Sequence, residues 1–421
     1  MSTYNRFQGE VMAGGSVHEQ PDDELAGGWR GALGVLGIVA LLAWLGFTNI
    51  WWFAFVVGVL VAVFMHELGH FLTARWTGMK ATQFFIGFGP RLWSFRRGET
   101  EYGVRALPLG AFVRIIGMNS MDEVPAAEEQ RTYRAQTYPK RMLVITAGSI
   151  MHVLMAIALL FTVYIVDGEI VQRDGAAVTF VEPSGPAFSG GLREGDVVTA
   201  LDGRTVTDPA RLGELVRANS PGDVVTIEVL RDGRPLALEV GLGANIDESS
   251  ALFGQPYIGV GSNGVFETIE HGVAGAAVNS VTDIFPVAWE STKGVINVLN
   301  PVNIIGHLSG STDDISTRPT TLVGVTGISD DIGQAQGFIG ILFLLAVLNV
   351  FVGVFNMFPL LPLDGGHAAI ATYERLRERG GKRYYADVAK LMPFAMAVIT
   401  VLLFLFMAGL YLDITDPIGG G

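Results

Sequence analysis

Two histidines and a glutamate stand close together in this 421-residue chain, in the run His66-Glu67-Leu68-Gly69-His70. A spacing of four places both imidazoles on one face of a helix, where they could grip one metal ion. Two imidazoles and one carboxylate leave zinc an open position, where a bound water can attack a carbonyl. Glu67, next to the first histidine, would take the proton of that water and return it to the leaving amine.

This short pattern has two simpler explanations, a surface helix that carries it by chance or a buried His and Glu pair that satisfies itself. The surroundings of the pattern favour a functional site over both explanations. The run lies at the end of a long apolar stretch that begins at residue 31. A charged side chain at the centre of a membrane helix costs about 2.5 to 3.5 kcal/mol, so such residues are functional by default.

Asp364 is the predicted third ligand, and it follows an apolar stretch that two prolines interrupt. Pro359 and Pro362 cannot sustain regular helical hydrogen bonding, so the chain should unwind there. Irregular backbone at membrane depth is tolerated where it is buried in protein or lines a wet cavity. Gly365 and Gly366 permit a tight turn that aims the carboxylate at the metal. A helix end facing the cytoplasm is the alternative for Asp364.

The elements that position these residues are expected to be membrane helices. Half of the chain is apolar and only 16% is charged, against about one quarter in soluble proteins. Four stretches without charge each meet the length of about 20 residues that a span needs, namely 31–65, 142–166, 338–363 and 391–412. The first predicts two spans, 33–47 and 51–72, joined near Thr48-Asn49. One long tilted helix and a re-entrant first segment are the alternatives.

The charge distribution predicts the orientation of these spans. Residues 75–141 carry 11 Lys or Arg against 6 Asp or Glu, and residues 364–390 carry 6 against 4, whereas residues 167–336 carry 9 against 23. Basic loops stay in the cytoplasm, so the acidic segment is expected outside. The net charge of −13 argues against a nucleic-acid partner. The chain has no cysteine, which excludes disulfides and thiolate ligands.

Between the spans, two regions show patterns of their own. Apolar runs between Gly and Pro residues predict short hairpin strands in the first cytoplasmic loop, either at the membrane surface or as a purely structural meander. Hairpin turns at Asp202-Gly203 and Asp232-Gly233, with a helix capped by Asp208, predict a compact domain of strands and two short helices outside.

The predicted order of parts is as follows: a disordered cytoplasmic tail (1–30), one or two membrane segments that end in the HExxH helix (31–75), a cytoplasmic loop with a membrane-associated β region (76–140), a transmembrane helix (141–166), the compact extracytoplasmic domain (172–243), a linker with an amphipathic helix (244–336), a transmembrane helix with the proline motif (337–364), a cytoplasmic loop (365–390) and a last transmembrane helix (391–412).

The pairing of the His66 to His70 motif with the run from Asn356 to Gly366 resembles the site-2 protease family of intramembrane zinc metalloproteases. The stretch Phe85 to Gly117 looks particularly like bacterial, actinobacterial members, and the resemblance includes one PDZ domain. The run Gly191-Leu192-Arg193-Glu194-Gly195-Asp196-Val197-Val198 looks like the carboxylate loop and strand of bacterial PDZ domains. The resemblance implies a polytopic α-helical membrane protein. It would have four core transmembrane helices and an extra N-terminal one, a membrane-associated β-hairpin region and an extracytoplasmic PDZ-like α+β domain.

The resemblance also assigns roles to single residues: His66, His70 and Asp364 as ligands of one Zn²⁺, Glu67 as the catalytic acid and base, and Asn356 and Pro359 as holders of the substrate backbone. The stretch 87–110 resembles the β region on which an unwound substrate adds as a strand. Where the family carries Gly-x-x-x-Asn, this chain has Gly148 followed by His152. His152 is a candidate auxiliary group that could donate to the same carbonyl, or a packed histidine bonded to a neighbouring helix.

The function implied is cleavage of transmembrane segments of single-pass membrane proteins, with anti-sigma factors as the expected substrates, in regulated intramembrane proteolysis after a prior site-1 cut. The PDZ-like domain would bind a peptide or a carboxyl terminus. We expect a protein of the bacterial plasma membrane, embedded in the lipid bilayer, with its active site toward the cytoplasm. Two other classes remain: a receptor with a closed structural metal site, and an ion transporter, which would spread polar residues along several helices.

Overall fold

The structure, a computed structural model, describes residues 28–118, 122, 124–246, 253–312, 314–378, 383–386 and 388–418. These residues form two compact units. Unit 1 combines the chain before Asp167 with the chain from Gly272 onward, and unit 2 is Asp167–His271. Residues 1–27 of the predicted N-terminal tail lie outside the described residues, and Trp29 already belongs to the first helix.

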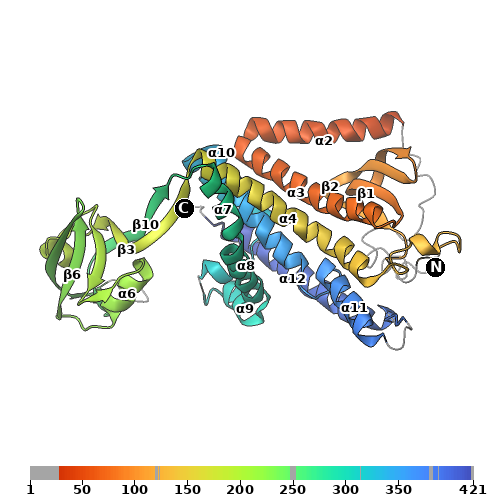
Figure 1. Ribbon diagram of the computed structural model, residues 1–421. Helices are drawn as coiled ribbons and strands as arrows, with labels where there is room; N and C mark the ends of the chain where they lie inside the picture. Colours follow the sequence, from red (N-terminus) through yellow and green to blue (C-terminus); the bar gives the residue numbers. More distant parts are fainter. Residues whose placement is uncertain are drawn as a thin grey trace. The chain divides into compact units, whose positions relative to one another are not determined.

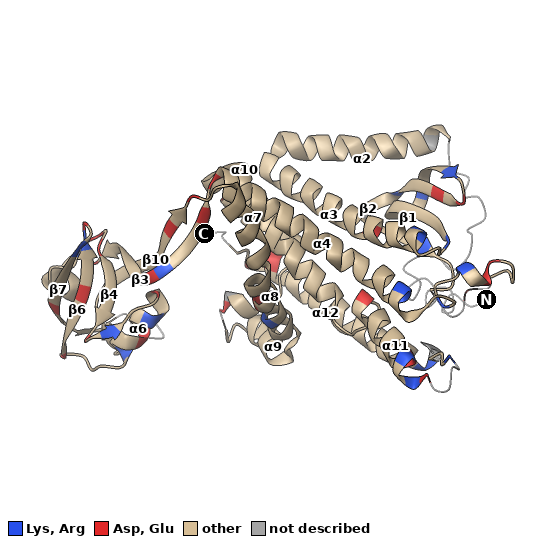
Figure 2. Ribbon diagram, viewed as in Figure 1, with Lys and Arg blue, Asp and Glu red and all other residues tan. Residues whose placement is uncertain are grey.

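Unit 1 is helical. Within the described ranges, five helices are long and apolar enough to cross a membrane: α2 (Trp29–Thr48), α3 (Ile50–Trp76), α4 (Tyr138–Val166), α10 (Leu322–Asn356) and α12 (Met392–Thr415). Helices α3, α4 and α10 pack against one another (Figure 1). Figure 2 shows few charges along these long helices, whereas Lys and Arg gather at the hairpin of β1 (Ala81–Arg97) with β2 (Thr100–Ile115) and at α11 (Asp364–Arg377).

Asn49 separates α2 from α3. Residues 31–65 therefore belong to two helices, as in the prediction of two spans, and not to one long helix. The backbone of Asn49 is extended, and its Oδ1 accepts from the N–H groups of Trp51 and Trp52 at 2.9 and 3.0 Å. These bonds satisfy two of the free donors at the start of α3. Its Nδ2 donates to Asp330 Oδ1 at 2.8 Å, which ties this corner to α10.

For the predicted helix 337–364, the start agrees with a break at Gly337, where two helices join within α10, and only the end is wrong. Helix α10 starts at Leu322, contains a non-helical Gly337 with φ of 67°, and ends at Asn356. The chain unwinds before the two prolines, as their missing N–H groups require. The range 365–390 was predicted as a loop, yet it contains most of α11 (Asp364–Arg377). Asp364 therefore occupies the first position of a helix rather than the end of one.

In the β region, two long bent strands pair through several shorter segments, which agrees with the predicted short hairpin strands. Strand β1 (Ala81–Arg97) pairs with β2 (Thr100–Ile115), and residues 84–86 of β1 have partners in both halves of β2. Gly87 and Gly89 have φ of 89° and 81°. These glycines bend β1 between its two paired segments, at the Gly and Pro residues by which the sequence pattern divides the strands.

Unit 2 contains a sheet with the strand order β10-β3-β4-β6-β7, and β5 pairs with β4. The strands are β3 (Glu169–Val181), β4 (Val197–Leu201), β5 (Arg204–Thr205), β6 (Val224–Arg231), β7 (Arg234–Gly241) and β10 (Val260–Ile269), with helices α5 (Pro186–Ser189) and α6 (Pro209–Arg217) beside them. A single apolar cluster fills the space between sheet and helices. Asp208 caps α6 by accepting from Arg211 N at 2.8 Å, as predicted.

The boundaries 172–243 and 244–336 need correction. Strand β10 pairs with β3 along its length, so the sheet takes in a segment that was predicted as linker. A short ladder of β8 (Gly243–Ala244) with β9 (Pro256–Tyr257) precedes it. The remainder is helical, with α7 (Val273–Thr282), α8 (Ile284–Leu299), α9 (Pro301–Ser309) and the start of α10. Pairing between distant strands carries no local signal, which is why composition alone left this region unassigned.

The loop before β4 is held by a buried ion pair. Asp196 is 1% exposed and accepts from Arg231 Nε and Nη2, both at 2.8 Å, and from Arg193 N at 2.9 Å. Arg231 Nη2 also donates to the Gly191 carbonyl at 2.8 Å. Burial raises the pKa of Asp196, but the hydrogen bonds from Arg231 and Arg193 outweigh it and hold the pKa below its ordinary value of 3.8.

We expect Arg231→Ala to lower the local unfolding free energy of unit 2 by about 1.5 to 3 kcal/mol, because it leaves a buried carboxylate without its charged partner. The difference should be full above pH 3.8 and vanish as the pH falls through the lower native pKa, since a lowered carboxylate pKa stabilises only the ionised state. Hydrogen exchange of the full chain measures it, with the exposed Arg204→Ala as control. Equal protection in both variants would contradict this role.

Candidate metal centre

His66, His70 and Asp364 lie together between α3 and the start of α11. The two Nε2 atoms are 3.1 Å apart, and Asp364 Oδ2 lies 3.4 Å from His66 Nε2 and 3.2 Å from His70 Nε2. Both histidines are buried. Among the described residues, this group of three could hold a metal ion. The sequence predicted this set, and the structure brings all three of its members together.

These donor atoms fit zinc. Ligand atoms about 2.0 to 2.1 Å from a tetrahedral zinc ion lie roughly 3.3 Å from one another, close to the observed separations. Asp364 Oδ2 is buried and makes no hydrogen bond within the described structure. A metal site requires such an arrangement. The buried carboxylate oxygen faces two ring nitrogens, and no well-oriented hydrogen bond joins it to either of them.

Backbone contacts from α4 orient the two imidazoles. His70 Nδ1 donates to the Val144 carbonyl at 2.7 Å, which leaves Nε2 free for a metal. The ring of His66 occupies the space in front of Gly148, where an added Cβ would lie 2.6 Å from Nδ1. At Gly69 an added Cβ would lie 2.8 Å from the Ala147 carbonyl oxygen. Glycine at both positions therefore allows α3 and α4 to approach closely.

Glu67 points to the β hairpin. Its Oε2 accepts from the backbone N–H of Val113 at 3.1 Å. Residues 111–115 of β2 pair with β1 on one side only, so Val113 lies on an open strand edge. The sequence predicted both Glu67 and the β region, but nothing in it indicated that a backbone amide of the hairpin would hold this carboxylate.

His152 is buried beside the metal group, with its ring centroid 5.1 Å from that of His66. Asn349 Nδ2 donates to the Leu345 carbonyl at 2.7 Å, so Oδ1 faces His152 Nδ1 at 2.8 Å. Nδ1 must therefore carry the proton in a neutral ring, and Nε2 is then an acceptor. The contact with Asn349 fits the alternative of a packed histidine bonded to a neighbouring helix. A neutral ring with Nε2 as acceptor has no further N–H to donate to a carbonyl, so the auxiliary role stays a prediction.

The other predicted residues lie on the connection between α10 and α11. Asn356 is the last residue of α10, and Pro359 is exposed in the loop that follows. Glycine is required at the first turn of α11, because a Cβ at position 366 would lie 2.7 Å from the backbone nitrogen of Leu361.

Helix α11 is anchored by a pair that sequence reasoning missed. Arg141 Nη2 lies 2.7 Å from Glu374 Oε2; Glu374 is buried and Arg141 is partly buried. Glu374 Oε1 also accepts from Ala386 N at 2.8 Å. This ion pair joins the start of α4 to the helix that begins with Asp364. Both charges were visible in the sequence, but their pairing was not.

Residues 54–400 match the Peptidase family M50. The chain belongs to this family. It is 30% identical over 396 residues to the zinc metalloprotease Rip1 of Mycobacterium tuberculosis, covering 86% of this chain and 97% of that one. The corresponding protein of Mycolicibacterium smegmatis is 31% identical over the same shares. A putative zinc metalloprotease of Brucella suis is 32% identical over 75% of this chain and 84% of its own.

The family confirms the resemblance to site-2 proteases, and this M50 member is a zinc-dependent protease. Among solved structures, part of the chain is similar to the PDZ domain of an SdrC-like protein of Listeria monocytogenes, at 27% identity and a TM-score of 0.20, covering 22% of this chain and 90% of that domain.

We expect Gly148→Ala to lower zinc affinity by about 10- to 100-fold, the usual effect of disturbing a residue that orients a ligand. The added methyl group must displace the His66 ring. Gly37→Ala in α2 is the matched control, because an added Cβ there meets nothing within 4 Å. Zinc content at buffered free zinc measures the effect, and equal zinc retention in both variants would contradict the close approach of α3 and α4.

Proposed function

We propose that this M50 protease cuts single-pass membrane proteins within or at the edge of the bilayer, with anti-sigma factors as the expected substrate class. The observation that carries the proposal is the placement of His66, His70, Asp364 and Glu67 among apolar helices, next to an open strand edge. A purely structural zinc site is closed by four protein ligands. Among the described residues, the group contains three.

The chemistry follows from these side chains. His66, His70 and Asp364 would hold the zinc ion, which when bound supplies a Lewis acid and an activated water. Glu67 is the general base, and the amide of Val113 holds its Oε2. The proton is therefore taken up at Oε1 and later delivered to the leaving amine. The Val144 carbonyl keeps His70 in the tautomer that offers Nε2.

The substrate backbone must be extended to reach this site, because a helix hides its amide groups. The open edge at residues 111–115 offers unpaired backbone groups to a further strand. Addition of a substrate strand there would bring its peptide bonds past Glu67. Asn356 and Pro359, on the chain that leads to Asp364, would hold the substrate backbone, as the resemblance to the family implies.

The orientation is part of the proposal. Basic residues around β1–β2 and α11 favour a cytoplasmic position for the end of unit 1 that carries the metal group (Figure 2). Unit 2 would then lie outside the cell. Its Gly191 to Val198 motif and the Asp196 clamp support a PDZ-like domain that binds a peptide or a carboxyl terminus left by a prior cut.

Glu67→Gln should retain zinc and lose about 10²- to 10⁴-fold in the rate of peptide cleavage, since the amide keeps the size of the side chain but cannot accept the proton. The test is cleavage of a candidate single-pass substrate in liposomes, together with zinc analysis of the same preparation. Proteolysis at the normal rate by the folded, zinc-loaded variant would contradict the role of Glu67.

Removal of unit 2, with Val166 joined to Gly272 through a short Gly-Ser linker, should raise the cleavage of intact substrates several-fold and leave pre-cut substrates unaffected. The reason is that a domain outside the membrane can exclude bulky exported parts. The deletion must include β10, because β10 pairs with β3. If the preference for pre-cut over intact substrates stays unchanged, unit 2 is no size filter.

A further inference from the structure

Helix α2 precedes residues 54–400, which match the family, so family membership assigns it no role. It packs against α3 and against the β1–β2 hairpin (Figure 1). Only one face of the helix makes these contacts, since Gly34 and Ile38 are half-buried whereas Leu36 is 61% exposed. The half-buried face is therefore a contact surface within the protein, and the opposite face is left to lipid.

The contact between α2 and the hairpin is made at Leu92. A Cβ added at Gly34 would meet three atoms of the Leu92 side chain, at 2.5, 2.9 and 3.2 Å, so the two residues touch. Leu92 is the only buried side chain among residues 91–97, all of which the structure describes. Its neighbours Trp93 and Phe95 are about half exposed. The segment 91–97 is therefore packed into the protein at the one residue that meets α2.

The pairing within the hairpin makes it a sheet of four segments. Residues 100–105 of β2 pair with 83–86 of β1 on one side and with 91–97 on the other, and residues 83–86 pair in turn with 111–115. The order across the sheet is therefore 111–115, 83–86, 100–105 and 91–97. Its two outer segments are the one beside Glu67 and the one that meets α2.

Each outer segment has its own anchor. On the catalytic side, the amide of Val113 donates to Glu67, and the Val113 side chain packs against the cluster of Phe71 and Phe84. On the far side, Leu92 rests on α2. Backbone ladders join the two anchors, and hydrogen-bonded elements carry a displacement from one side to the other. A shift of the far segment should therefore reach the edge beside Glu67.

We propose that α2 is a positioning element for the substrate-binding edge. Through the contact of Gly34 with Leu92 it holds the far side of the four-segment sheet, and thereby fixes residues 111–115 beside Glu67. This inference rests on the proposed function, because that edge is where an extended substrate is expected to add as a strand. Gly34 and Leu92 are positioning residues and act through the ladder between the two edges.

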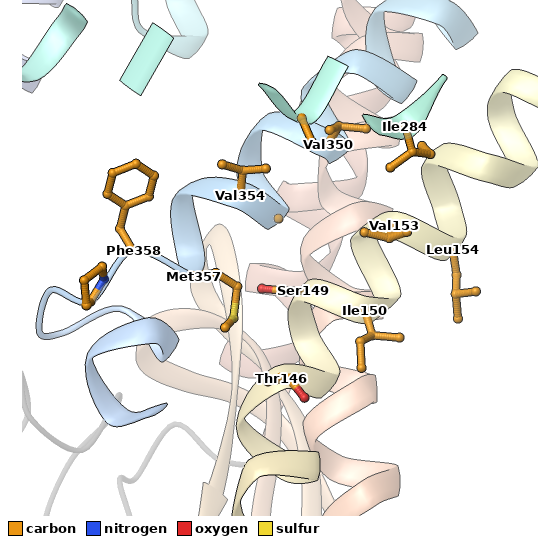
Figure 3. Close-up of a pocket in the computed structure, with 13 residues that line it drawn as sticks. Thr146, Ser149, Ile150, Val153, Leu154, Ile284, Val350, Val354, Met357 and Phe358 are labelled. Carbon is orange, nitrogen blue, oxygen red and sulfur yellow. The ribbon is translucent and has the colours of Figure 1, made fainter. Parts of the chain in front are cut away.

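The apolar groove of unit 1 has no residue in common with this contact. It has a volume of about 580 Å³ and lies between α4 and α10 (Figure 3). Among the described residues, those that line it belong to α4, α8, α10 and the chain after α10 as far as Pro359. Substitutions at Gly34 or Leu92 therefore leave its walls unchanged, and their effects can be assigned to the sheet.

Gly34→Leu tests the contact, and Gly37→Leu is its matched control. The two are the same change in the same helix, and leucine favours a helix over glycine at both positions. At Gly34 the new side chain must displace Leu92, whereas a Cβ at Gly37 meets nothing within 4 Å. The measurement is hydrogen exchange of residues 100–105 and 111–115 in the zinc-loaded full chain without substrate. We expect several-fold faster exchange in both segments for Gly34→Leu, and no change for Gly37→Leu.

A complementary pair of substitutions separates this contact from general damage. Leu92→Ala alone should loosen the same amides, because it removes the side chain that rests on α2. Gly34→Leu combined with Leu92→Ala should restore most of the protection, since the new leucine fills the space that the old one leaves. Zinc content should equal that of the unaltered protein in every variant.

Cleavage of a quenched-fluorescence peptide with one apolar segment of about 20 residues gives the second readout. Gly34→Leu should raise KM several-fold more than it lowers kcat, because the edge that binds the substrate is displaced while the metal group stays in place. The double variant with Leu92→Ala should return KM toward its original value.

Equal exchange in Gly34→Leu and Gly37→Leu, or no recovery in the double variant, would overturn the proposal. A lower kcat with loss of zinc at constant KM would also overturn it, because the damage would then lie at the metal centre. Exchange is measured without substrate, so it decides the role of α2 whether or not the chain cleaves. Failure of the unaltered protein to cleave the peptide would count against the proposed function alone.

Discussion

The metal centre depends on the close approach of α3 and α4. The ring of His66 fills the space in front of Gly148, and Gly69 faces the Ala147 carbonyl at a distance that excludes a side chain. The same contact lets the Val144 carbonyl reach His70 Nδ1. With less room between these helices, the two imidazoles could not both present Nε2 to one point. Gly69 and Gly148 thus set the positions of the two histidine ligands, because the absence of a side chain lets the helices approach closely.

The third ligand comes from the far end of the chain and is positioned by breaks in regular structure. Pro359 and Pro362 end α10, and the glycines after Asp364 allow α11 to start against the same loop. The Arg141–Glu374 pair then ties α11 to α4, the helix that already orients the histidines. One helix therefore supports both halves of the site, and the hairpin adds the amide of Val113 that holds Glu67.

Local patterns in the sequence were sufficient for much of this. His66, Glu67, His70 and Asp364 could be predicted because ionisable residues are costly in apolar surroundings, and the break at Asn49 followed from span length. What failed depended on distant pairing. The helix after Asp364 and the addition of β10 to the sheet left no local signal that separated these segments from loops. The amide of Val113 could not be predicted, since every residue but proline carries one.

The central claim is that two histidines of α3 and the first residue of α11 hold one zinc ion with a position left open. X-ray absorption at the zinc edge, on the purified full chain and on its Asp364→Ala variant, tests it most directly. We predict two imidazole nitrogens and light oxygen ligands at about 2.0 to 2.2 Å in the unaltered protein, and loss of stoichiometric zinc from the variant. A site with four protein ligands, or a zinc spectrum unchanged by Asp364→Ala, would contradict the account.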